Sequence, residues 1–167
     1  MPGYETHKYV GMAAGMGYSA FQAKEQTPLN LVAEMVGGTV AGSVGGRLPD
    51  IIEPGTSSWH RSVAHSGTTA TAVAVAAKTM LADFGKFCRA KGDEFHSLAN
   101  EGKMVPSPLQ PNVSISVPVD PLMQLLYLIG ELLCHFLAGL ANGLAAGYVS
   151  HLALDACVGS RSIPLFG

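Results

Sequence analysis

The spacing of the glycines constrains the fold of this chain more than any other feature of its sequence. Several glycines recur at every fourth position within long apolar stretches: Gly11 and Gly15; Gly38, Gly42 and Gly46; Gly139, Gly143 and Gly147. A glycine inside a helix costs roughly 0.5–1 kcal/mol relative to alanine, so repetition on one helical face indicates a compensating gain. Small residues four apart let helix backbones approach closely, most often in membrane bundles. The pattern predicts tightly packed helices.

Composition agrees with a helical bundle of low polarity. The chain has 167 residues, which is the length of one domain, with 48% hydrophobic and only 13% charged residues. The charged share is about half that of an ordinary soluble protein. Its formal net charge of −2 gives no basic footprint for nucleic acid. We therefore expect either a membrane protein or an unusually apolar soluble bundle, with no nucleic-acid partner.

Four helical blocks are predicted, which makes residues 1–167 a single all-α domain. They cover about 7–26, 28–46, 66–89 and 121–157, and the last has alternative breaks at Gly130 or near Gly139. Thr27 is a suitable N-cap before Pro28 at the first helical position. Residues 47–65 are predicted to form a loop, and 92–120 an irregular insertion in which 113–117 is a short strand or an extended strap.

Membrane embedding or association is favoured by the last block. Pro121–Gly147 is interrupted by few polar residues, chiefly Glu131 and His135, and a span needs about 20 apolar residues. Ionisable groups at membrane depth normally face the bundle interior and mark function, and Glu34 is a further example. A soluble bundle is the alternative.

Histidine and aspartate residues gather at three separated places and predict a divalent-metal site. Asp50 follows Leu-Pro, His60 and His65 lie in the next loop with Arg61, and His151 and Asp155 share one helical face. Imidazole with carboxylate suits zinc, and also manganese or magnesium. His7 is a further candidate ligand. Alternatively, the loop histidines are merely solvated and the helical pair makes a local hydrogen bond.

These segments, in this order, resemble the YdjM-like family of inner-membrane-associated proteins that are assigned as metal-dependent hydrolases. The resemblance rests on 6–15, Gly45–Asp50, His60–Ser66, Gly147–Asp155 and 163–166. It implies His7, Asp50, His60, His65, His151 and Asp155 as metal-site residues, with Arg61 beside them. The family's loop contains a Gly and a Thr that 62–64 lack, and Ile52 stands where the family has a second acidic residue.

The sequence and the resemblance together give two hypotheses for function, and a metal-binding site that serves only stability is a third option. The first is a hydrolase of the bacterial inner membrane that acts on an ester or phosphoester, including lipid-like substrates, through water activated by the metal. In it Asp50 would be a ligand or general base, and Arg61 would stabilise negative charge. The second is a non-enzymatic assembly protein, a homo-oligomer of a membrane or shell, either phage-encoded or cytoplasmic, that retains the scaffold.

Overall fold

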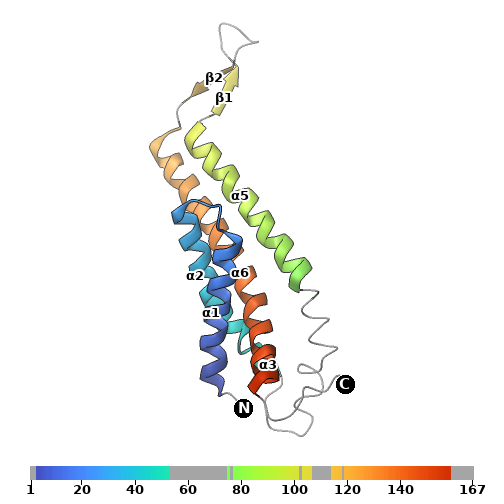
Figure 1. Ribbon diagram of the computed structural model, residues 1–167. Helices are drawn as coiled ribbons and strands as arrows, with labels where there is room; N and C mark the ends of the chain where they lie inside the picture. The colour runs from blue at the N-terminus through green and yellow to red at the C-terminus, as the bar shows by residue number, and fades with distance from the viewer. Residues whose placement is uncertain are drawn as a thin grey trace.

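The computed structural model describes residues 3–52, 75, 77–101, 103–106, 114–117 and 119–158. Four long helices dominate this part of the chain (Figure 1): α1 Tyr4–Gln22, α2 Pro28–Gly45, α5 Ala82–Glu101 and α6 Pro121–Val158. The short helix α3 spans Leu48–Ile52, and the π-helical turn η1 spans Ala77–Leu81. Strands β1 Lys103–Pro106 and β2 Ser114–Val117 pair antiparallel, with Lys103 opposite Val117. The all-α bundle predicted from the sequence is confirmed.

Several local predictions are also confirmed. Thr27 caps α2, because its hydroxyl oxygen accepts a hydrogen bond from the backbone N–H of Asn30 at 3.4 Å, and Pro28 is the first residue of the helix. β2 occupies the predicted extended segment at 113–117. The helix predicted at 121–157 is one continuous helix of 38 residues, without a break at Gly130 or Gly139.

Two predicted boundaries are wrong. The third helix was expected to end at about Arg89, whereas α5 continues to Glu101, so 92–101 is not part of an irregular insertion. Gly92 lies inside α5 and packs against the His135 ring of α6, where a Cβ atom would lie 2.8 Å from His135 Nε2. The first residues of the predicted loop at 47–65 form α3, because Pro49 is tolerated in the first turn of a helix.

The predicted glycine ridges are the contact surfaces of the bundle. A Cβ atom built on any glycine of the three repeats would lie within 3.0 Å of a neighbouring helix. Gly143 and Gly147 of α6 face Gly38 and Gly42 of α2, so these helices run parallel; Gly15 of α1 faces Gly38 from an antiparallel helix. Backbone-to-backbone packing of this kind requires glycine.

The bundle has polar groups inside and large apolar groups outside. Its buried polar side chains are His7, Ser19, Asn30, Glu34, Glu131, His135, Asn142, His151 and Asp155. Conversely, a row of valines one turn apart is exposed along α2, at Val32, Val36, Val40 and Val44. A soluble protein normally buries such residues. The surface of this bundle therefore suits an apolar environment.

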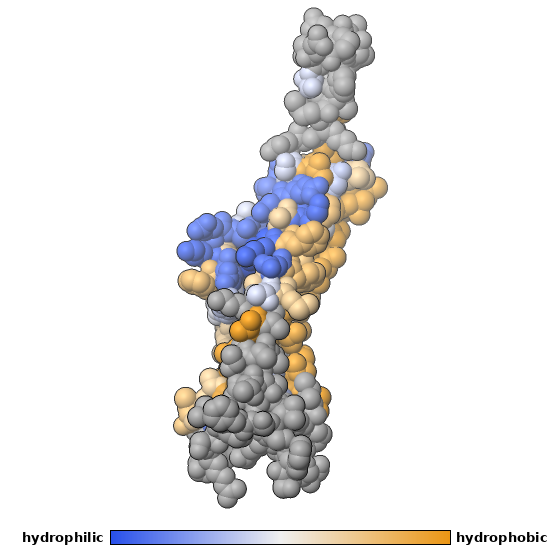
Figure 2. Space-filling view, turned by 90° about the vertical axis from the view of Figure 1, so that its right-hand side faces the viewer, coloured by the Kyte–Doolittle hydropathy of each residue, from blue (hydrophilic) through white to orange (hydrophobic). Residues whose placement is uncertain are grey.

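The side formed by α5 differs from the rest. Asp83, Lys86, Lys91 and Asp93 of this helix are exposed, and Figure 2 shows hydrophilic residues gathered on this side beside a hydrophobic edge. Among the described residues, α6 is the one helix long and apolar enough to cross a membrane by length and composition. The molecule thus has an apolar side and a polar side.

Candidate metal centre

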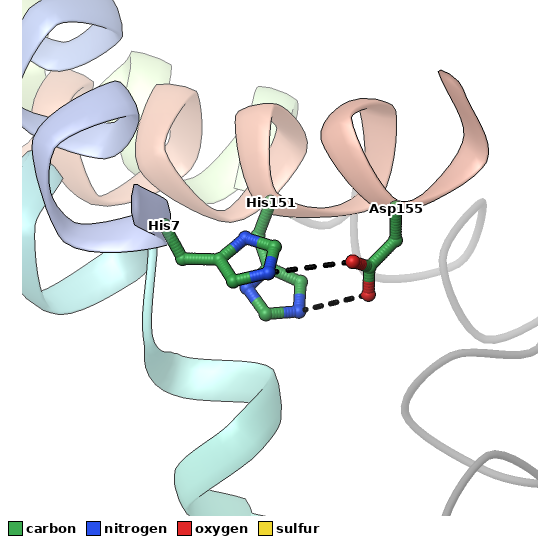
Figure 3. Close-up of side chains that lie close together, drawn as sticks. All are labelled: His7, His151 and Asp155. Carbon is green, nitrogen blue, oxygen red and sulfur yellow. Dashed lines mark ion pairs between the residues drawn. The ribbon is translucent and has the colours of Figure 1, made fainter. Parts of the chain in front are cut away.

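Three of the predicted ligands meet at one end of the bundle. His7 comes from the first turns of α1, and His151 and Asp155 come from the last turns of α6 (Figure 3). All three residues are buried, and one ligand atom from each lies within 4.8 Å of the others. His7 Nε2 is 3.3 Å from Asp155 Oδ1, and His151 Nε2 is 3.5 Å from Asp155 Oδ2.

The glycine ridge positions both imidazoles. His151 Nδ1 lies 2.8 Å from the Gly46 carbonyl oxygen, and this contact is a hydrogen bond that the ring must donate. The proton on Nδ1 leaves Nε2 of the neutral ring as a lone-pair donor that faces Asp155. The His7 ring stacks on that of His151 with centroids 3.9 Å apart, and the His7 backbone lies against Gly46. Gly46 therefore sets the position of both histidines.

Asp50 joins this group from α3, as the sequence predicted. Its Oδ1 lies 3.7 Å from His151 Nε2, and its side chain is 30% exposed, whereas the His151 side chain is fully buried. α3 follows directly after α2, so the end of the glycine ridge also places this carboxylate. Asp50 is consequently the member of the group that faces the surface.

The separations between these groups fit the coordination of a metal ion. The three imidazole–carboxylate contacts, at 3.3, 3.5 and 3.7 Å, exceed the usual length of a hydrogen bond to a carboxylate. Two atoms that each lie about 2.0 Å from a tetrahedral zinc ion are roughly 3.3 Å apart. Two imidazoles and two carboxylates form a donor set that zinc or manganese accepts. The residues present therefore fit a divalent metal.

Three predicted site residues, His60, Arg61 and His65, lie outside the described residues. The site therefore rests on His7, Asp50, His151 and Asp155, which come from three helices and are separated by up to 148 positions in the sequence.

A second cluster of buried polar groups lies in the middle of the bundle and was not predicted as a site. Glu34 of α2 accepts two hydrogen bonds from Arg89 of α5, at 2.8 Å from Nε and 2.6 Å from Nη2. Its Oε1 also lies 3.0 Å from His135 Nδ1 of α6. We call Glu34, Arg89 and His135 the mid-bundle cluster. It joins three helices and neutralises its own charge.

A third group lies one helical turn away. Glu131 of α6 accepts a hydrogen bond from Asn30 Nδ2 of α2 at 2.7 Å, and its oxygens lie 3.1 and 3.2 Å from His96 Nδ1 of α5. Glu34 follows Asn30 by four positions, and His135 follows Glu131 by four. The same helix faces thus contribute to both groups. Glu34, Glu131 and His135 could have been singled out from the sequence, because they interrupt apolar helices. Arg89 could not, because it lies in a helix with several other charged residues.

Comparison with known proteins adds no further assignment: no family model, curated protein or solved structure matches this chain.

Proposed function

We propose that this protein is a membrane-associated, metal-dependent hydrolase whose centre is formed by His7, Asp50, His151 and Asp155. The observation that carries the proposal is the spacing of these groups. Asp155 lies 3.3 Å from His7 and 3.5 Å from His151, and Asp50 lies 3.7 Å from His151; these distances fit ligands around one ion better than direct hydrogen bonds. The resemblance to the YdjM-like family points to the same residues.

The surface of the bundle supports the membrane assignment. Apolar side chains are exposed along α2 and α6, while the interior contains glycines, several alanines and polar groups besides Tyr148 and Leu152. α6 has 38 residues and is about 57 Å long, which exceeds the roughly 30 Å hydrocarbon core of a bilayer. In our proposal the α1, α2 and α6 side contacts lipid, and the charged side of α5 faces away from it.

Each residue of the centre has a distinct role in this proposal. His7, His151 and Asp155 are buried and hold the ion, and the hydrogen bond from His151 Nδ1 to Gly46 keeps that ring oriented. The ion would supply a Lewis acid and lower the pKa of water at the site. Asp50 is the most accessible member and is therefore suited to accept a proton from that water. Arg61 would stabilise the negative charge of a phosphoester.

Metal analysis of the purified full-length protein tests the site. We expect about one zinc or manganese ion per chain, and a large loss of occupancy in His151→Ala and His7→Ala. His96→Ala is the control, because it removes an imidazole elsewhere in the bundle. Full metal occupancy in both site variants would contradict the proposal.

Hydrolysis of activated esters and of a phosphodiester tests catalysis separately. Asp50→Asn should abolish turnover while His7, His151 and Asp155 still bind the metal. Equal turnover in Asp50→Asn and in the unmodified protein would remove Asp50 from the reaction.

A structural role is the second candidate, favoured by one observation: the centre joins the ends of α1, α3 and α6. An ion held there would fasten three helix ends, as structural zinc sites do. A chelator that lowers the melting temperature of a protein without any measurable hydrolysis would favour this role. Homo-oligomers formed through the exposed apolar faces would favour the assembly hypothesis.

A further inference from the structure

We propose that a second site, at the other end of α6, binds an organic amine. A cavity of about 400 Å³ lies between the end of α5 and the beginning of α6, and Glu131 and His96 are among the residues that line it. Glu131 and His151 are 20 positions apart on one continuous helix, which corresponds to roughly 30 Å. The site is therefore separate from the metal centre.

The charge of Glu131 carries this proposal. Its side chain is only 4% exposed, and in the described part of the chain it contacts the Asn30 side-chain amide and the His96 imidazole. Glu34, by contrast, has the Arg89 guanidinium as its counter-ion. His96 is the one ionisable partner of Glu131 among the described residues; its side chain is 51% exposed, and it offers a positive charge only when protonated. A buried carboxylate beside a neutral imidazole is costly, and a bound ammonium group would supply a permanent positive charge. A carboxylate has about four lone-pair directions, so it can accept further hydrogen bonds.

The other polar groups of the cavity also favour a cation. The amide nitrogen of Asn100 donates to the His96 carbonyl at 2.9 Å, and that of Gln124 donates to the Ala99 carbonyl at 3.4 Å. Their amide oxygens remain as acceptors. No lysine or arginine stands among the described residues that line the cavity. Such a site selects a donor-rich, positively charged group and disfavours a phosphate alone.

The remaining walls are apolar and suit a hydrocarbon body attached to the amine. Pro121, Leu125 and Leu128 line the cavity. Leu122, Leu126 and Ile129 are exposed on the same stretch of α6. An alkyl chain could therefore continue from the cavity along the helix. Two sources carry this chemistry: the head group of an aminolipid, or a free alkylamine.

Isothermal titration of the purified full-length protein in a neutral detergent tests the site, with n-hexylamine as the probe. n-Hexanol tests the tail without the charge, and ethanolamine tests the amine without the tail. We expect hexylamine to bind at least about tenfold more tightly than either, since a charge-assisted hydrogen bond and apolar burial both contribute. Equal binding of hexylamine and hexanol would overturn the proposal.

Two variants test whether the cavity itself binds the amine, as distinct from an effect of the substitution on folding. Glu131→Gln keeps the shape of the side chain and should weaken hexylamine binding about tenfold or more, whereas the exposed control Asp93→Asn should not change it. Ala99→Phe keeps Glu131 and its partners but fills the cavity, so it should also abolish binding. If both cavity variants bind hexylamine like Asp93→Asn, the inference is wrong and His96 alone balances Glu131.

Nanodiscs then distinguish the two sources of amine. The protein is titrated with hexylamine in discs of phosphatidylglycerol alone and in discs that also contain phosphatidylethanolamine. Weaker hexylamine binding in the second discs would support the aminolipid, because the lipid competes. Unchanged tight binding would support a free amine. Absence of hexylamine binding in both discs would overturn the proposal.

Discussion

The candidate metal centre and the mid-bundle cluster both combine imidazole with carboxylate, but only the mid-bundle cluster contains an arginine, and the distances within the two sets differ. In the mid-bundle cluster, Glu34 lies 2.6 to 3.0 Å from its Arg89 and His135 partners. At the metal centre, the imidazoles lie 3.3 to 3.7 Å from the carboxylates. Direct hydrogen bonds to Arg89 and His135 satisfy the Glu34 carboxylate in the first set, whereas the longer distances in the second set leave room for an ion. The arginine and the shorter distances together distinguish the mid-bundle cluster from the candidate metal centre.

The largest expected effect comes from breaking the mid-bundle cluster. Arg89→Ala removes the guanidinium and leaves Glu34 buried without its counter-ion, which should destabilise the protein by about 3–5 kcal/mol. Unfolding of the variant in detergent, followed by circular dichroism, measures this loss. Lys86→Ala is the control, because its pair with Asp83 is exposed and should contribute less than about 1 kcal/mol. Equal stability of the two variants would mean that α5 is held by other contacts.

Metal removal should have a smaller effect, confined to the other region. An ion present at about 100 times its dissociation constant stabilises the folded state by about 2.7 kcal/mol. A chelator should therefore lower the melting temperature of the unmodified protein and leave that of His151→Ala nearly unchanged. An equal decrease in both proteins would show that the chelator acts elsewhere.

Gly46→Ala tests whether the position of the two histidines controls metal affinity when every proposed ligand is still present. Gly46 has ordinary right-handed helical angles, φ −66° and ψ −10°, so alanine introduces no backbone strain there. Its Cβ would, however, collide with the His7 backbone. We expect a 10–100-fold loss of metal affinity, the usual size for groups that orient ligands, with little change in the mid-bundle cluster. Gly17→Ala is the matched control, because nothing lies within 4 Å of a Cβ at that position. Metal titration compares the two.

The packing faces of the helices and the start of α2 could be predicted from the sequence, because both depend on residues within a few positions of one another. The four-residue repeats predicted the close contacts of α1, α2 and α6, and Thr27-Pro28 predicted the start of α2. The sequence also predicted His7, Asp50, His151 and Asp155 as candidate ligands, and the helices that carry the glycine ridges bring these residues to one end of the bundle.

The contact between Glu34 and Arg89 in the mid-bundle cluster could not be predicted from the sequence. Arg89 lies in a helix with several exposed charges, and only the packing of α5 on α6 turns it toward Glu34. α5 also continues to Glu101, beyond the expected end at about Arg89, and packs on α6 through Gly92. The orientation of Arg89 and the packing of α5 both depend on contacts between helices that are distant in the sequence. The spacing of residues along the chain does not predict such contacts.

The smallest expected effect is the coupling between the two regions. His135 and His151 are 16 positions apart on α6, or roughly 24 Å, and the glycine contacts of α2 and α6 lie between them. Sites this far apart with no shared partner are normally additive to within about 0.3–0.5 kcal/mol. The unfolding free energies of His7→Ala, Arg89→Ala and the double variant, measured without metal, give this coupling directly. A coupling above about 1 kcal/mol would mean that the glycine ridge transmits displacement between the regions, so that α5 and the metal centre respond to each other.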